Sequence, residues 1–139
     1  MNADFFLDTN VFVYMFDETD DPKRTSAENL VQQALEEREG CISYQVVQET
    51  VNVLSGKLNA SPHQVRRIFN HVLLPLWQVN PSERLYHRGL DLQSRYRYGF
   101  YDSLIVAAAL ESGCRILYTE DLHQGQQIDD LTIRNPFEN

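Results

Sequence analysis

Four acidic residues fall where predicted strands end or predicted helices begin: Asp8, Glu49, Asp102 and Asp121. Asp8 and Asp121 each follow a short apolar run, Asp102 lies at the start of an apolar helix, and Glu49 lies on a helix that follows another short run. Two carboxylates about 4 Å apart repel by roughly 4 kcal/mol at an effective dielectric near 20. If these acids gather at one place, they therefore require protonation or a bound cation.

The chemistry that suits such a group of acids is hydrolysis assisted by a hard divalent cation. Carboxylate oxygens without a cluster of histidines or cysteines favour Mg²⁺ or Mn²⁺ over Zn²⁺. A Mg²⁺ ion held by a few carboxylates keeps several water ligands and is often completed by substrate phosphates. Such an ion activates water and stabilises charge on the attacked phosphate, which suits phosphodiester cleavage.

The stretch from Gly99 to Gly125 is expected to position two of the four acids. Its apolar residues and three consecutive alanines predict a closely packed helix that begins at Asp102 and ends at Gly113, a residue free to adopt a left-handed conformation. Ile116–Tyr118 predicts a short buried strand, and Asp121 lies just beyond its end. In an open α/β sheet, ligands bind beyond the carboxyl ends of the strands. We expect both acids at that edge.

The rest of the chain alternates short apolar runs with helical patterns. The other predicted strands are 5–7, 41–43, 77–79 and a final edge strand at 131–133. The other predicted helices are 11–16, 22–39, 44–55, 62–74 (stopped by Pro75) and 82–96. This alternation is typical of an α/β fold of three layers, α/β/α, with a short central parallel sheet covered by helices. We expect a single domain over 1–139.

Two of the acids have alternative interpretations. Glu49 shares a helix face with Val46 and Val53, so we expect it on the side that faces the interior, where a lone charge needs a partner or a cation. An ordinary surface glutamate is the alternative. Asp8 is followed by Thr9 or Asn10 as the expected helix cap. In the alternative interpretation, Asp8 itself is only a capping or turn residue.

Composition and charge limit the classes of partner. The chain has 139 residues, 42% of them hydrophobic and 23% charged, as in an ordinary globular domain. Its net charge of −8 argues against a broad basic surface for nucleic acid. Cys41 and Cys114 are predicted to be buried thiols. We expect no membrane span and no secretory signal, and therefore a cytoplasmic protein.

The sequence resembles the PIN-domain family, and more narrowly the VapC-type toxin ribonucleases of type II toxin–antitoxin systems. The segments that carry the resemblance are FLDTN at 6–10, SYQVVQE at 43–49, YDSLIVAAA at 101–109 and LYTEDL at 117–122. The resemblance implies a PIN-like fold and a Mg²⁺- or Mn²⁺-dependent endoribonuclease. It also implies that the catalytic, metal-binding residues are Asp8, Glu49, Asp102 and Asp121.

Neighbours of these acids have expected supporting roles. Asn10 and Thr119 fall within the matched motifs and are expected to assist as polar neighbours, and Glu120 is expected outside the direct ligand set. Many relatives carry a further acid where this chain has His123. We expect a local cationic rim for RNA at Arg95 and Arg97, with Arg84, Arg88, Lys23 and Arg24 as further candidates. An exposed helix face is the alternative for these arginines.

The expected partners also follow from the resemblance. They are an RNA substrate, a small antitoxin whose tail covers the acidic cleft, and a second copy of the chain. The helices at 62–74 and 82–96 are candidates for the homodimer interface. Two other functions compete with the nuclease: a phosphoacceptor signalling domain, and a non-catalytic binding module that retains the acidic metal pocket.

Overall fold

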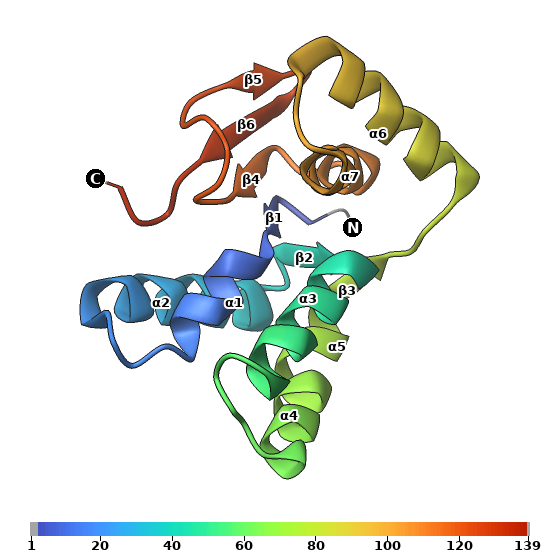
Figure 1. The fold of residues 1–139 in the computed structure, drawn as a ribbon. Helices are drawn as coiled ribbons and strands as arrows, with labels where there is room; N and C mark the ends of the chain where they lie inside the picture. The colour runs from blue at the N-terminus through green and yellow to red at the C-terminus, as the bar shows by residue number, and fades with distance from the viewer. Residues whose placement is uncertain (1–2, 139) are drawn as a thin grey trace.

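A six-stranded sheet forms the centre of the computed structural model, which describes residues 3–138 (Figure 1). The strand order is β3-β2-β1-β4-β6-β5. All neighbouring strands are parallel except β5 and β6. The strands are β1 Phe5–Leu7, β2 Gly40–Ser43, β3 Trp77–Val79, β4 Ile116–Tyr118, β5 Gln127–Ile128 and β6 Leu131–Arg134.

Helices cover both faces of this sheet. They are α1 Thr9–Met15, α2 Asp21–Glu37, α3 Tyr44–Ser55, α4 Pro62–Ile68, η1 Phe69–Leu73 (a π-helical segment), α5 Leu74–Leu76, α6 Glu83–Tyr96 and α7 Phe100–Glu111. Figure 1 shows α1 and α2 on one side of the strands and α6 and α7 on the other. The mostly parallel sheet between two helical layers confirms the predicted α/β class.

The central strands and α7 form the core. Phe6, Leu7 and Leu117 are fully buried, as expected for parallel strands covered on both faces. Seven consecutive residues of α7, from Ser103 to Ala109, are buried as well. This helix is apolar on all sides because α6 and strands β2 and β4 surround it. The predicted helix end is confirmed, since Gly113 has a φ of +76°.

The strand predicted at 131–133 is present as β6, but the prediction that it lies at the edge of the sheet is wrong. β6 lies between β4 and β5, and the edge belongs to the two-residue strand β5. β5 pairs antiparallel with β6 across a tight turn in which Asp129 has a φ of +53°. Two residues are too few for an alternating pattern, so the sequence carried no signal for this strand.

The predicted stop of the fourth helix at Leu74 is also wrong, because helical structure continues through Pro75 to Leu76. The π-helical segment η1 precedes this proline, and Pro75 then lies at the start of α5. Proline is tolerated in a first helical turn, where the N–H has no intrahelical partner. The π-helical turn before Pro75 is the place where the regular α-helical hydrogen-bond pattern is interrupted.

Two predictions on the chain's environment bear on the described residues. Cys41 and Cys114 are both buried with free thiols, as predicted, and their Sγ atoms lie 3.5 Å apart. Within residues 3–138, no helix is both long enough and apolar enough to cross a membrane.

Candidate active site

The candidate site lies beyond the carboxyl ends of β1 and β4. The chain leaves β1 for β2 on one side, while β4 pairs with β1 on the other, so the strand order reverses between β1 and β4. Ligands bind in α/β sheets at such a reversal. The backbone N–H of Asp8 donates to the carbonyl of Tyr118 at 3.0 Å, so the two strand ends are joined at this edge.

Asp8 is the buried centre of the site. Its Oδ1 accepts a hydrogen bond from the backbone N–H of Thr9 at 2.7 Å, and its Oδ2 accepts one from Thr119 Oγ1 at 2.8 Å. Burial raises the pKa of Asp8 to about 7; these two hydrogen bonds oppose the rise, and repulsion from Asp121 and Glu49 adds to it. Near neutral pH, binding a proton or a cation would therefore relieve the energetic cost of the buried Asp8 carboxylate.

Asp8 is also the N-cap of α1, so the expectation of a cap at Thr9 or Asn10 is wrong. Its backbone is extended and its side chain accepts from the first helical N–H. The capping interpretation and the site interpretation therefore both hold. The cap fixes one carboxylate oxygen and thereby directs the side chain.

Thr119 and Asn10 hold Asp121 in position near Asp8. Thr119 is fully buried, and its Oγ1 accepts hydrogen bonds from the backbone N–H of Asp121 at 3.1 Å and from Asn10 Nδ2 at 3.3 Å. Asn10 Nδ2 also donates to Asp121 Oδ2 at 3.1 Å. The hydroxyl of Thr119 therefore links Asp8 to the exposed Asp121, and both residues have the neighbouring position expected of them.

Glu49 does not face the interior, so that expectation is wrong. Its side chain is exposed, and Oε1 accepts from Thr9 Oγ1 at 2.9 Å and from Gln45 Nε2 at 3.5 Å. Val46 and Val47 of α3 are buried, whereas this glutamate reaches Thr9 on α1. Gln45 Nε2 also donates to the carbonyl of Tyr101, which ties α3 to the first turn of α7.

Asp102 reaches the site from that first turn of α7. It is partly buried, and its pKa is raised by burial and by repulsion from Asp121. Thr119 forms hydrogen bonds with both Asp8 and Asp121, and Thr9 forms hydrogen bonds with both Asp8 and Glu49. Asp102 interacts with this group through the charge repulsion between Asp102 and Asp121. The structure thus brings the four predicted acids to one edge of the sheet.

The four acids do not form a complete set of metal ligands in their present side-chain positions. Among residues 3–138, no group of three or more His, Cys, Asp or Glu side chains is close enough to hold an ion as it stands. The chemistry of the donors nevertheless suits a hard cation, because all four are carboxylates and two have raised pKa values from burial and mutual repulsion. A divalent ion would relieve that repulsion.

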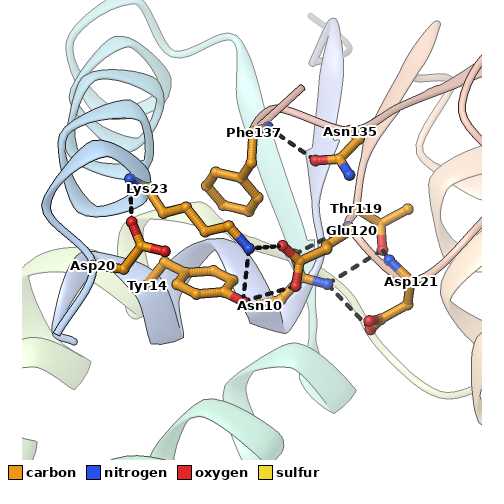
Figure 2. Close-up of polar contacts among 9 residues, drawn as sticks. All are labelled: Asn10, Tyr14, Asp20, Lys23, Thr119, Glu120, Asp121, Asn135 and Phe137. Atoms are coloured by element: carbon orange, nitrogen blue, oxygen red, sulfur yellow. Dashed lines mark hydrogen bonds and ion pairs between the residues drawn. The ribbon is translucent and has the colours of Figure 1, made fainter. Parts of the chain in front are cut away.

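Glu120 points away from its neighbour Asp121 (Figure 2). Its carboxylate accepts from Lys23 Nζ at 2.6 Å and from the hydroxyl of Tyr14 at 2.8 Å. Sequence patterns did not indicate Tyr14 as a partner here, although it lies four residues after Asn10 and hence on the same face of α1. Lys23 was expected only as a candidate for the cationic rim.

The arginines expected to form the cationic rim fall into two groups, those at the C-terminal end of α6 and those that pair with an acid of α7. Arg95 is exposed and donates to the hydroxyl of Tyr96 at 3.1 Å. Arg97 is exposed at the C-cap of α6 in a left-handed conformation. Arg84 and Arg88 both form ion pairs with Glu111 of α7, at 3.3 and 3.0 Å, so one carboxylate offsets only part of their combined positive charge.

A separate hollow lies away from the acids. This cavity of about 820 Å³ is bounded by the end of α1, the end of α3 and helix α4, with Phe16, Leu54, Lys57 and Arg67 among its lining residues. None of the four acids lines it.

Comparison with known proteins gives a match over most of the chain. The model of the PIN domain family matches residues 5–127. No curated protein matches the chain significantly.

Several solved structures share the fold. One, described as a toxin–antitoxin complex from Klebsiella pneumoniae, is 23% identical with a TM-score of 0.70, over 99% of this chain and 100% of that chain. VapC20 from Mycobacterium tuberculosis, described as a sarcin-ricin loop cleaving toxin, is 19% identical with a TM-score of 0.63, over 84% and 89% of the two chains. FitAcB from Neisseria gonorrhoeae is 16% identical with a TM-score of 0.69, over 97% and 99%.

Proposed function

The chain belongs to the PIN domain family, and from this premise we propose that it is a Mg²⁺- or Mn²⁺-dependent endoribonuclease, the toxin of a toxin–antitoxin pair. The observation that carries the proposal is the environment of Asp8. A buried carboxylate at the reversal of strand order, with a pKa of about 7 and two further acids raising it, is poised to exchange a proton for a cation.

The residues that would hold the ion are Asp8, Glu49, Asp102 and Asp121. The ion would supply an activated water and offset the charge that develops on the attacked phosphate. Polar neighbours orient these carboxylates, as side chains around metal ligands commonly do.

Each acid has its own orienting contact. Thr119 directs one oxygen of Asp8, and Thr9 Oγ1 directs Glu49. Asn10 directs Asp121 by its 3.1 Å hydrogen bond. The contact from Gln45 to the carbonyl of Tyr101 fixes α3 against the turn that carries Asp102.

RNA is the proposed substrate class. VapC20, which has the same fold, is described as a toxin that cleaves the sarcin-ricin loop. Tyr101 is 67% exposed directly beside Asp102, so its ring is available to stack on an unpaired base. The exposed Arg95 and Arg97 are the proposed phosphate contacts, and a local rim of this kind is compatible with the net charge of −8.

We also propose a small antitoxin and a homodimer as partners. The similar structure from Klebsiella pneumoniae is described as a toxin–antitoxin complex. An antitoxin tail that places an Arg or Lys among the four carboxylates would neutralise the same charge as the ion. For the dimer, the exposed apolar residues Leu74, Trp77, Tyr86 and Leu90 lie on or beside the candidate helices. Sedimentation of a monomer at micromolar concentration would exclude this dimer.

The nuclease proposal is tested by cleavage of a structured RNA and a single-stranded RNA with Mn²⁺ or with EDTA. The wild type should cleave with Mn²⁺ only, and Asp8→Asn and Asp102→Asn should each lower the rate about 100-fold or more. Asp91→Asn is the matched control, since Asp91 is an exposed aspartate on α6 that is not one of the four candidate acids. An Asp8→Asn variant that cleaves at the wild-type rate would remove Asp8 from the mechanism. Intact RNA in every arm would contradict the nuclease proposal.

A further inference from the structure

A cluster of four residues lies next to Asp121, on the side to which Glu120 points (Figure 2). The Lys23 cluster consists of Tyr14 from α1, Lys23 from α2, Glu120 from the turn after β4, and Phe137 near the carboxyl end of the chain. Lys23 Nζ lies 2.6 Å from Glu120 Oε2 and 3.2 Å from the hydroxyl of Tyr14. The hydroxyl of Tyr14 in turn donates to Glu120 Oε1 at 2.8 Å. All three polar groups therefore contact one another.

Aromatic rings enclose the ammonium group of Lys23. Its Nζ lies 4.5 Å from the ring centre of Tyr14 and 5.6 Å from that of Phe137. The two rings pack edge to face with centres 4.8 Å apart, and the Asn135 side chain accepts from the N–H of Phe137 at 2.9 Å. An isolated surface ion pair contributes little. This one is partly shielded, with side-chain exposures of 32% and 26%, and belongs to a network with cation–π contacts.

The Lys23 cluster is connected to the acids through α1. Asn10 and Tyr14 lie one turn apart on the same face of this helix. Asn10 Oδ1 accepts from the backbone N–H of Glu120 at 3.4 Å, while Asn10 Nδ2 donates to Asp121 Oδ2 at 3.1 Å. Helix α1 thus holds the turn at its backbone, at Asp121 and, through Tyr14, at Glu120.

We propose that Lys23 and Tyr14 are positioning residues that fix the turn 119–121 by anchoring Glu120, so that Asp121 is held toward the other acids. The part of this proposal that concerns cation binding rests on the proposed function. Glu120 itself is committed to Lys23 and Tyr14 and serves as the anchor. Side chains behind a metal site typically influence its affinity through such orientation.

Removal of the Lys23 charge should change the affinity for a cation in opposite directions, depending on whether Lys23 acts by its charge or by positioning the turn. Loss of a positive charge makes the neighbourhood more negative, and by Coulomb's law this alone would strengthen cation binding. Loss of the anchor releases the turn and weakens binding. Lys23→Gln therefore separates the two effects, and Lys57→Gln is the matched control, because Lys57 is exposed and lies near Asp17 instead.

The first measurement uses the metal-free protein in EDTA. Hydrogen exchange by mass spectrometry reports on the backbone N–H groups of Glu120 and Asp121, which donate to Asn10 and Thr119 in the structure. We expect faster exchange in this segment for Lys23→Gln and wild-type exchange for Lys57→Gln. Unchanged exchange in Lys23→Gln would overturn the proposal, whether or not the protein binds metal.

The second measurement is calorimetric titration with Mn²⁺. We expect the dissociation constant to rise about tenfold in Lys23→Gln, to stay at or below the wild-type value in Lys57→Gln, and to return toward the wild-type value in Lys23→Arg. Arginine keeps the charge and can both donate to Glu120 and stack on the rings. Binding by Lys23→Gln as tight as or tighter than wild type would overturn the positioning role.

The controls distinguish failure of this inference from failure of the proposed function. A wild type that takes up no Mn²⁺ contradicts the proposed function, and the exchange measurement then decides the positioning role alone. If Lys23→Gln does not fold, Tyr14→Phe replaces it, because it removes one hydroxyl without changing charge. This variant should show the same direction of change in both measurements, and wild-type behaviour in both would overturn the proposal.

Discussion

Asp8→Asn should stabilise the metal-free protein near pH 8, although it removes the centre of the candidate site. In the folded protein, burial and neighbouring acids raise the pKa of Asp8 from its ordinary value of 3.8 to about 7. At about 1.4 kcal/mol for each pKa unit, an ionised Asp8 then costs the folded state about 4 kcal/mol relative to its protonated form. A neutral side chain of the same shape avoids this cost.

The substitution also removes the hydrogen bond that Asp8 accepts from Thr119. An asparagine oxygen can accept from the N–H of Thr9, but its amide group would face Thr119 Oγ1, where the carboxylate now accepts. That hydroxyl already accepts from Asn10 and from the N–H of Asp121, so the new donor finds no free acceptor there. The mismatch costs about 1 kcal/mol. We therefore expect a net gain of about 3 kcal/mol in the free energy of unfolding near pH 8.

The pH dependence follows from the direction of the pKa change. A carboxyl group with a higher pKa in the folded state keeps its proton over the range from about 4 to about 7, where the unfolded chain has lost it. Ionisation of Asp8 therefore lowers the stability of the wild type as the pH rises through this range, and the variant lacks this contribution. Below about pH 4 both states are protonated, and the variant should have no advantage.

The assay is urea unfolding in EDTA, followed by far-ultraviolet circular dichroism at several pH values, with Asp91→Asn as the control. The difference between the variant and the wild type should grow with pH and level off above about pH 8. A difference that is the same at every pH would refute the argument that an ionised Asp8 opposes folding.

Three further variants test the contacts that support the site and the fold, each by urea unfolding. Thr119→Val removes the hydroxyl that donates to Asp8 at 2.8 Å, and we expect a loss of about 2 kcal/mol near neutral pH; wild-type stability would contradict the linking role of this hydroxyl. Gly40→Ala would bring a Cβ against the Cβ of Ala34 and to 3.2 Å from its Cα, so we expect a loss of about 2 to 3 kcal/mol; a neutral result would mean that α2 can move from β2. Ser61→Ala disrupts the capping box of α4 and should cost about 1 kcal/mol, with no effect on Mn²⁺ binding.

Local patterns were enough to locate most of the fold. The strands at 5–7, 77–79 and 116–118 have the predicted bounds because each is a short run rich in apolar residues that stops at a turn or helix signal, which is too short for a buried helix and favours a strand. The position of Asp102 in the first turn of α7 follows from the same kind of local pattern. The family match over residues 5–127 agrees with the resemblance that these segments indicated.

Tertiary geometry accounts for what sequence patterns missed. The periodicity of α3 placed Glu49 among valines, yet a long side chain at the border of that face reaches Thr9, forty residues away. The contact of Lys23 with Glu120 spans 97 residues, and only the folded sheet edge brings the two together. The two-residue strand β5 is likewise defined by its partner β6 rather than by its own sequence.

The central claim is that Asp8, Glu49, Asp102 and Asp121 bind one or more divalent cations at the carboxyl edge of the sheet. The most direct test is a crystal grown with Mn²⁺, with anomalous scattering measured at the manganese absorption edge. We predict a peak within about 2 to 2.5 Å of carboxylate oxygens from Asp8 and at least one of the other three acids. A crystal with bound Mn²⁺ at other residues and no peak among these carboxylates would contradict the claim.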